Sequence, residues 1–322
     1  MRSLAATVRE LLLRWRGRLS SRQAGIVLVY HRVGGNEGDE DVEILPAVSG
    51  EAFERELEHL RRHYRVVPAA EIVEAARRRG RGERFPVSIT FDDDTSSHVV
   101  SALPALRKAG LTATFFVGGA SLHGPHRFWW EDLQLAIDGK LIGPDGLPHL
   151  DERDVRAALE RKPRAILDLT GKIVRLDQPE REDVIGALRE AAGPPSPDSG
   201  LREADVQSLL DGGNTIGFHT LDHDVLPAVS DAELSRVLHP GAELRTAVGE
   251  RTLDVIAYPH GKADARVAEA ARAAGFSRGF TTARGVVKPE TDPLLIPRTV
   301  ADLSPPALAL RLARAFGKNP NA

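Results

Sequence analysis

Short apolar runs alternate with longer helical patterns through most of this 322-residue chain. Runs typical of buried strands lie at residues 25–30, 85–91, 112–117, 214–218, 254–258 and 277–282. Helical patterns lie between them, at residues 51–62, 99–110, 232–238 and 264–274. A chain in which strands and helices alternate is expected to form a parallel sheet with helices outside it, either open or closed into a barrel.

One stretch and both ends of the chain depart from this alternation. Residues 129–203 carry helical patterns with Pro and Gly punctuation and no convincing strand pattern, which predicts a helical insertion in a single domain over residues 23–305. Residues 1–22 carry six Arg and one Glu, with apolar residues at helical spacing, which indicates a basic amphipathic helix. Residues 306–322 are expected to form a C-terminal helix and tail.

Composition and the N-terminal pattern limit the expected partners and location. The chain has 43 basic and 46 acidic residues and a net charge of -3, so no chain-wide field favours nucleic acid as a partner. No apolar stretch is long enough for a secretory signal or a transmembrane helix, so we expect a cytoplasmic protein. The basic helix at residues 1–22 could contact the inner face of a membrane, but a helix docked on its own domain would show the same pattern.

Three consecutive carboxylates, Asp92, Asp93 and Asp94, directly follow the apolar run at residues 85–91. Unpaired charge is costly inside a buried strand, so these side chains are expected at the rim of the sheet, where α/β folds place their sites. The alternative is an Asp-rich turn in which Asp94 caps the next helix. A rim site would need a positive group to offset the repulsion between the aspartates.

Two histidines follow a later predicted strand. His219 and His223 lie four residues apart, a spacing that would direct both imidazoles the same way on one helical turn. The chain has no Cys, so His and carboxylate side chains must hold any metal. With Asp93 they would make a three-ligand set with an open position for water, as in catalytic zinc sites. The alternative is two ordinary histidines whose spacing arose by chance.

The motifs taken together resemble a known family. Four segments occur in the order V-L-V-Y-H-R-V (27–33), S-I-T-F-D-D-D (88–94), H-T-L-D-H (219–223) and A-Y-P-H-G (257–261). They resemble the polysaccharide deacetylase family, also called the NodB-homology or chitin-deacetylase-like domain, over residues 26–300. The resemblance implies a distorted (β/α) barrel with a helical insertion, a catalytic domain over residues 23–305, and metal-dependent hydrolysis of an N-acetyl group from a sugar.

The resemblance also implies roles for single residues. By position, Asp92 is the general base, and Asp93, His219 and His223 are the metal ligands. His260 stands where the family has an aromatic residue whose backbone N–H helps to hold the oxyanion, and a backbone donor does not depend on its side chain. The implied cofactor is a divalent metal, and we expect zinc.

The chain departs from the family pattern at several positions. Its last histidine is His260, so the usual C-terminal His that acts as general acid is missing. We expect His31 to replace it, because the first and last strands of a closed barrel are neighbours and an imidazole suits proton delivery; the alternative is that His31 only ends its strand. Ala257 replaces an Arg that pairs with the catalytic Asp, and Arg298 is the expected substitute. Asp94 replaces a Gly and adds charge beside the base.

Substrate contacts are expected from Tyr258 and Trp130. The adjacent indoles of Trp129 and Trp130 cannot both face one side of a helix, so one is expected in the core and the other against a sugar or lipid. The expected partner is an acetylated sugar or glycan, and the expected activity is N-deacetylation. Two alternatives are a deformylase or other non-peptide amide hydrolase on the same metal site, and a degenerate member that binds glycan without turnover.

Overall fold

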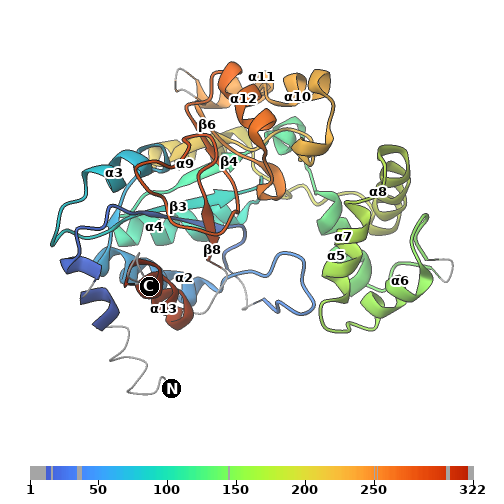
Figure 1. The fold of residues 1–322 in the computed structure, drawn as a ribbon. Helices are drawn as coiled ribbons and strands as arrows, with labels where there is room; N and C mark the ends of the chain where they lie inside the picture. Colours follow the sequence, from blue (N-terminus) through green and yellow to red (C-terminus); the bar gives the residue numbers. More distant parts are fainter. Residues whose placement is uncertain are drawn as a thin grey trace.

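The computed structural model describes residues 12–15, 17–34, 38–143, 146–249, 251, 253–301 and 305–317. Within them, eight strands form one sheet: β1 Ile26–Tyr30, β2 Arg65–Val66, β3 Pro86–Asp92, β4 Thr114–Val117, β5 Thr215–Phe218, β6 Val255–Ala257, β7 Arg278–Phe280 and β8 Arg298–Val300. Neighbours pair in parallel in the order β7-β6-β5-β4-β3-β1-β8, with β2 beside the start of β3. A parallel bridge between Phe280 and Ile296 nearly closes the sheet, which confirms the predicted distorted barrel (Figure 1).

The central strands are apolar and buried, as expected for a parallel sheet covered on both faces. Every residue of β1 and β3 is buried, and the register places Tyr30 opposite Phe91. The apolar runs do not predict β2 and β8. These strands are only two and three residues long and begin with Arg65 and Arg298, so no apolar run marks them.

Helices surround the sheet and pack against it and one another. They are α2 Gly50–His63, α3 Ile72–Arg78, α4 Leu103–Ala109, α9 Glu203–Asp211, α10 Asp231–Val237, α11 Ala242–Val248, α12 Ala265–Ala273 and α13 Pro305–Gly317. At the start of α2, the Ser49 side chain accepts a hydrogen bond from the backbone N–H of Ala52, an ordinary N-cap. The helix predicted from residue 99 begins as a π-helix, His98–Ala102, and continues as α4 until Gly110, whose φ of 64° ends it.

Between β4 and α9, the described residues form four α-helices that stand beside the barrel (Figure 1). They are α5 Trp129–Asp138, α6 Glu152–Leu159, α7 Ala165–Ile173 and α8 Gln178–Ala192. They bury a hydrophobic cluster of their own that includes Leu133, Leu169 and Val184. Residues 129–143 and 146–203, which the structure describes, contain no strand.

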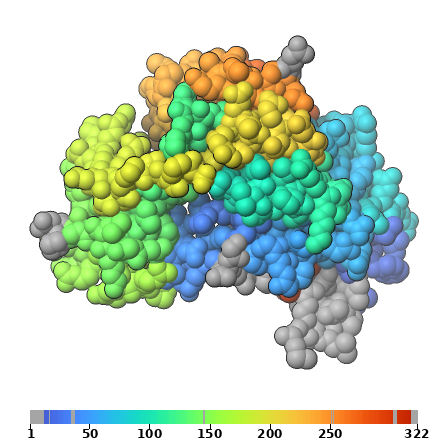
Figure 2. All heavy atoms as spheres, turned by 180° about the vertical axis from the view of Figure 1, so that it is seen from behind, coloured from blue at the N-terminus to red at the C-terminus, as the bar shows by residue number. Residues whose placement is uncertain are grey.

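The helical insertion is also tied to the loop that follows β1. The Gln134 side chain accepts a hydrogen bond from the backbone N–H of Ile44 and donates one to the carbonyl oxygen of Val42. Seen from behind, the insertion and the barrel leave a hollow between them (Figure 2). The insertion therefore supplies a wall beside the rim of the barrel.

The two ends of the chain are partly described. Residues 12–15 and 17–19 are helical, while residues 1–11 and 16 of the expected N-terminal helix lie outside the described residues. At the other end, α13 is described, and residues 318–322 are not. None of the helices in the described ranges combines the length and apolar character needed to cross a bilayer.

Candidate metal-binding and catalytic site

The carboxyl ends of the parallel strands gather the expected site residues at one rim of the barrel. Asp92 ends β3 and Asp93 follows it, while His31 follows β1 and His219 follows β5. A cavity of about 230 Å³ at this rim is lined by His31, Asp92, Asp93, His219, His223 and His260. Further wall residues are Ile44, Leu45, Trp129, Trp130, Thr170, Gly261 and Thr282. Barrel, β1 loop and helical insertion thus build one cavity.

Asp93, His219 and His223 form a compact set of potential metal ligands. The Oδ1 atom of Asp93 lies 3.5 Å from Nε2 of His219 and 3.6 Å from Nε2 of His223. One ligand atom from each residue lies within 4.8 Å of the other two. Oδ1 of Asp93 is buried and has no hydrogen-bond partner, although a buried carboxylate oxygen normally needs one. Two imidazoles and one carboxylate suit a divalent transition metal, so these residues fit the implied cofactor.

A backbone hydrogen bond sets the orientation of the His219 ring. Its Nδ1 donates to the carbonyl oxygen of Ala257 at 2.8 Å, which leaves Nε2 as the unprotonated nitrogen of the neutral ring. That nitrogen is the one that faces Asp93. Metal-binding histidines commonly donate their other ring N–H to a carbonyl or carboxylate, and this arrangement has that form.

The histidine pair does not lie on a helical turn, so that sequence expectation is wrong. Residues 219–225 form a loop without helix, in which Thr220 and His223 have φ of 59° and 53°. Asp93, with φ of 73°, also adopts the left-handed conformation, which is unusual outside glycine and recurs at functional sites. Gly118 allows the loop to approach, because a Cβ there would lie 2.5 Å from the carbonyl oxygen of Thr220.

Arg298 and Asp92 form a buried, bidentate ion pair. Nη1 of Arg298 donates to Oδ1 of Asp92 and Nη2 to Oδ2, both at 2.6 Å. The two side chains are 0% and 4% exposed. Burial alone would raise the pKa of Asp92, but the charge of Arg298 and a further contribution from His219 outweigh it, so the pKa lies below its ordinary value. Asp92 is therefore a carboxylate near neutral pH.

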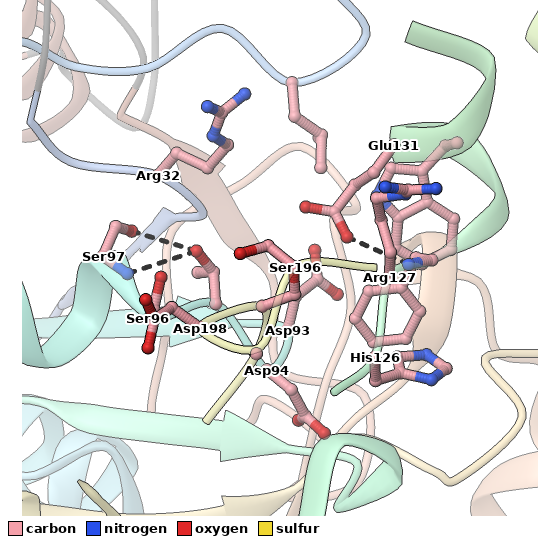
Figure 3. A pocket seen from close by; sticks show the side chains of 16 residues that line it. Arg32, Asp93, Asp94, Ser96, Ser97, His126, Arg127, Glu131, Ser196 and Asp198 are labelled. Atoms are coloured by element: carbon pink, nitrogen blue, oxygen red, sulfur yellow. Dashed lines mark hydrogen bonds between the residues drawn. The ribbon is translucent and has the colours of Figure 1, made fainter. Parts of the chain in front are cut away.

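Asp94 does not cap the following helix, so that alternative from the sequence is wrong. Its side chain instead stabilises a turn elsewhere in the barrel. Its carboxylate accepts hydrogen bonds from the backbone N–H groups of Gly118, Gly119 and Ser121 and from the Ser121 hydroxyl. In Figure 3 the Asp94 carboxylate points away from Asp93. Asp94 thus fixes the turn after β4, the turn against which the His219–His223 loop packs.

Replacement of Asp94 tests this structural role. We expect Asp94→Asn to lower the free energy of unfolding by about 1–3 kcal/mol, because the amide group cannot accept all of these buried hydrogen bonds. Urea denaturation measures the change. Asp211→Asn, at an exposed position on α9, is the matched control and should change stability little. Equal stability of the Asp94 variant and the native protein would contradict the role.

His31 faces the same cavity as the metal-ligand set, and a buried residue holds its backbone. Nε2 of His98 donates to the carbonyl oxygen of His31 at 3.0 Å. Burial lowers the pKa of His98 to about 4, so its ring is neutral and keeps this donor near neutral pH. The sequence interpretation assigned nothing to His98. Its position six residues after Asp92 was the only signal, and that spacing alone does not predict the contact.

Replacement of His31 tests its expected part in turnover. We expect His31→Ala to lower turnover by about 10²-fold or more, because a positioned general acid typically contributes that much. Metal content should stay unchanged, since the Asp93, His219 and His223 side chains remain. His239→Ala, at an exposed position, serves as the control and should leave turnover unaltered. Turnover of His31→Ala near that of the control would refute the role.

Trp130 and Tyr258 differ in their access to the cavity. Trp130 is largely buried, stacks on Phe128 with ring centroids 4.4 Å apart, and lies 4.4 Å from the His223 ring while lining the cavity. Tyr258 is fully buried, and its hydroxyl donates to the carbonyl oxygen of Leu294. A side chain with no exposed surface cannot touch a substrate, so the substrate contact expected from the Tyr258 side chain is wrong.

A second cavity, of about 270 Å³, adjoins the first and was not predicted from the sequence. It shares Leu45, Asp93 and Trp130 with the first cavity. Its lining is mostly polar and comes from the loops after β1 and β3, the start of α5 and the segment that leads to α9. Figure 3 shows Asp93 near its centre, with Arg32 on one side and Arg127 and Glu131 on the other. Asp93 thus borders both cavities, whereas His219 and His223 line the first one.

The fold and the site together define a class of protein: a near-closed parallel (β/α) barrel whose rim carries an Asp-His-His ligand set beside a second carboxylate. The family model described as "Polysaccharide deacetylase" matches residues 79–179 and 184–279, more than half of the chain. The chain therefore belongs to the polysaccharide deacetylase family. No curated protein gives a significant match to the chain.

Solved structures show the same fold at low sequence identity. The Streptococcus pyogenes deacetylase PplD, solved in complex with acetate, matches with a TM-score of 0.58 and 16% identity over 89% of this chain and 97% of its own. IcaB from Ammonifex degensii matches with a TM-score of 0.57 and 20% identity over 91% and 97%. A de-N-acetylase from Aggregatibacter actinomycetemcomitans matches with a TM-score of 0.56 and 14% identity over 87% and 95%. At these identities the likeness establishes the fold.

Proposed function

We propose that this protein is a metal-dependent hydrolase that removes an N-acetyl group from an N-acetylated sugar of a glycan. One observation carries the proposal: the buried, unpartnered Oδ1 of Asp93 faces the Nε2 atoms of His219 and His223. The ion pair between Asp92 and Arg298 lies directly beside this set. Membership of the polysaccharide deacetylase family supplies the reaction class.

Asp93, His219 and His223 would hold the metal. We propose zinc, because two imidazoles and one carboxylate are a set that catalytic zinc sites use and the chain offers no Cys. When bound, a divalent cation lowers the pKa of water and polarises the acetyl carbonyl group. The buried position of Asp93 and the oriented ring of His219 keep these ligands in place before substrate arrives.

The remaining residues would move the protons. Asp92 accepts a proton from water as the water oxygen attacks the amide carbon, and Arg298 keeps that carboxylate charged and oriented. The backbone N–H of His260 would stabilise the negative charge that develops on the amide oxygen. His31 would donate a proton to the leaving nitrogen as the C–N bond breaks. The products are acetate and a free amine on the sugar.

The second cavity supports a substrate larger than one acetamido group. It begins at Asp93 and is lined by Arg32, Ser96, Ser97, Glu131 and Asp198, whose polar atoms can form hydrogen bonds with sugar hydroxyls. We propose that a neighbouring sugar residue of the glycan occupies this cavity while the acetamido group enters the first one. Trp130, which lines both cavities, would lie between the two sugars.

An assay of released acid tests the function. The full chain is loaded with zinc and incubated with N-acetylated and N-formylated amino-sugar oligosaccharides of one to several residues, with and without a chelator. We expect acetate release that the chelator abolishes and that zinc restores. Formate release without acetate release would identify a deformylase, and binding without release of either acid would identify a glycan-binding member without turnover. Either result would overturn the deacetylase proposal.

A further inference from the structure

An exposed apolar face lies on the described part of the N-terminal helix. Among the described residues, the large apolar side chains with the most exposure include Leu12, Trp15 and Leu19, which are 56%, 64% and 39% exposed. Their spacing of three and four residues places them on one side of a helix. A helix that simply docked on its own domain would bury this face, whereas here the face remains in solvent.

The helix is nevertheless fixed to the barrel at its C-terminal end. The guanidinium of Arg79 is almost fully buried, lies 3.6 Å over the ring of Phe85, and donates hydrogen bonds to backbone carbonyl oxygens of the helix and the turn after it. These acceptors are the carbonyl oxygens of Gly17, Arg18, Ser20 and Arg22. Arg22 in turn donates to the carbonyl oxygen of Ala315 in α13. The exposed face therefore has a defined direction relative to the barrel.

The surface next to the exposed face is strongly basic. Trp15 itself lines a depression of about 260 Å³, together with Arg14, Arg18, Arg62, His63, Tyr64, Glu83, Arg84, Phe85, Ala313 and Phe316. Among the described residues of this lining, Glu83 is the only acidic one, although Arg62 also pairs with Glu58. The chain as a whole carries a net charge of -3, so this local excess of arginine is opposite in sign to the whole molecule.

We propose that this face, defined by Leu12, Trp15 and Leu19 with the exposed Arg18 and Arg84 beside it, docks on an anionic lipid bilayer. Apolar side chains on one side of a helix and arginines beside them are the pattern with which amphipathic helices bind at the boundary between lipid headgroups and acyl chains. The arginines complement lipid phosphate groups, and each basic residue near such a surface adds to binding. Trp15 suits this boundary because its ring is amphipathic.

This docking would fix the direction of the catalytic cavity. The helix is anchored beside Phe85 and Arg79, at the end of the barrel where β3 begins, whereas Asp92 and Asp93 lie at the end where β3 finishes. The seven residues of β3 separate the two ends by roughly 20 Å. A docked molecule therefore holds its cavity away from the lipid surface, towards a glycan that extends from it.

Sedimentation with lipid vesicles tests the proposal on the full chain. The probes are vesicles of phosphatidylcholine alone and vesicles that also contain phosphatidylglycerol, at about 0.1 M salt. We expect binding to the anionic vesicles and much weaker binding to the neutral ones. Leu12→Ser/Trp15→Ser/Leu19→Ser and Arg18→Gln/Arg84→Gln should each reduce binding by roughly tenfold or more. Leu135→Ser/Leu141→Ser, at exposed apolar positions of the insertion, is the matched control and should bind as the native chain does.

The outcomes separate this proposal from the proposed activity. All variants should unfold close to the native temperature, because the replaced side chains are exposed. They should also release acetate from soluble substrate as the native chain does, because none of these residues lines the catalytic cavity. Equal sedimentation of the native chain with both kinds of vesicle, or native binding by the apolar variant, would overturn the proposal. The proposal would also be overturned if the apolar variant changed only its oligomeric state, measured by size-exclusion chromatography, and not its vesicle binding. The face would then form a contact between protein chains.

Discussion

Asp92→Asn should lower turnover by about 10²- to 10⁴-fold while leaving metal content unchanged. The reason is that the two adjacent carboxylates have different contacts and therefore different expected roles. Asp92 contacts Arg298 through both oxygens, and each oxygen keeps a second lone pair for a proton. Asp93 instead turns its unpartnered oxygen towards the two imidazoles. Single-turnover kinetics and elemental analysis of the dialysed protein measure the two effects separately.

Asp93→Asn is the matched comparison for Asp92→Asn. It should lower both metal content and turnover, because the neutral amide is a poorer ligand for a divalent cation beside His219 and His223. Excess zinc should restore part of the activity of Asp93→Asn and none of the activity of Asp92→Asn. Equal loss of metal in both variants would mean that the two aspartates are not divided into a base and a ligand.

Arg298→Met should lower the free energy of unfolding by about 3–5 kcal/mol, because removal of one partner leaves the other charge buried and uncompensated. The Asp92 carboxylate would have no other positive side chain in hydrogen-bond contact within the described residues. Turnover should also fall, since burial would then raise the pKa of the base. Urea denaturation measures the stability change, and pH–rate profiles measure the change in the base.

A double variant distinguishes a lost ion pair from a merely disturbed core. Asp92→Asn/Arg298→Met should be more stable than Arg298→Met alone, because the uncompensated charge is gone. Arg311→Met, at an exposed position on α13, is the control and should change stability little. If the double variant is as unstable as Arg298→Met, the packing of the Arg298 side chain, and not its charge, stabilises this part of the barrel.

The strands could be predicted wherever burial on both faces left an apolar run. β1, β3 and β4 have this character, and their predicted positions agree with the structure to within two residues. β2 and β8 could not be predicted, because a two- or three-residue strand that begins with Arg has no periodicity to detect. Nevertheless β8 completes the pairing beside β1 and carries the partner of Asp92.

Within the site, the sequence indicated which residues belong together better than it indicated their conformation. Asp93, His219 and His223 follow strands in the sequence, and parallel strands bring such positions to one rim. The left-handed conformations of Asp93 and His223 were not predictable, because a non-glycine residue adopts them only where surrounding contacts outweigh the strain. The orientations of Asp94 and Tyr258 likewise depend on partners distant in the sequence.

The sequence alone determined the alternation of strands and helices, the family and the set of chemical groups at the rim, because apolar periodicity and motif order are local properties of the chain. The motifs also indicated Arg298 as the partner of Asp92, but only the tertiary structure decided that their contact is bidentate. It alone decided the structural role of Asp94 and the wall that the insertion adds to the cavity. These features arise from contacts between segments far apart in the sequence. Their geometry is set only when the barrel closes and side chains compete for the same buried space.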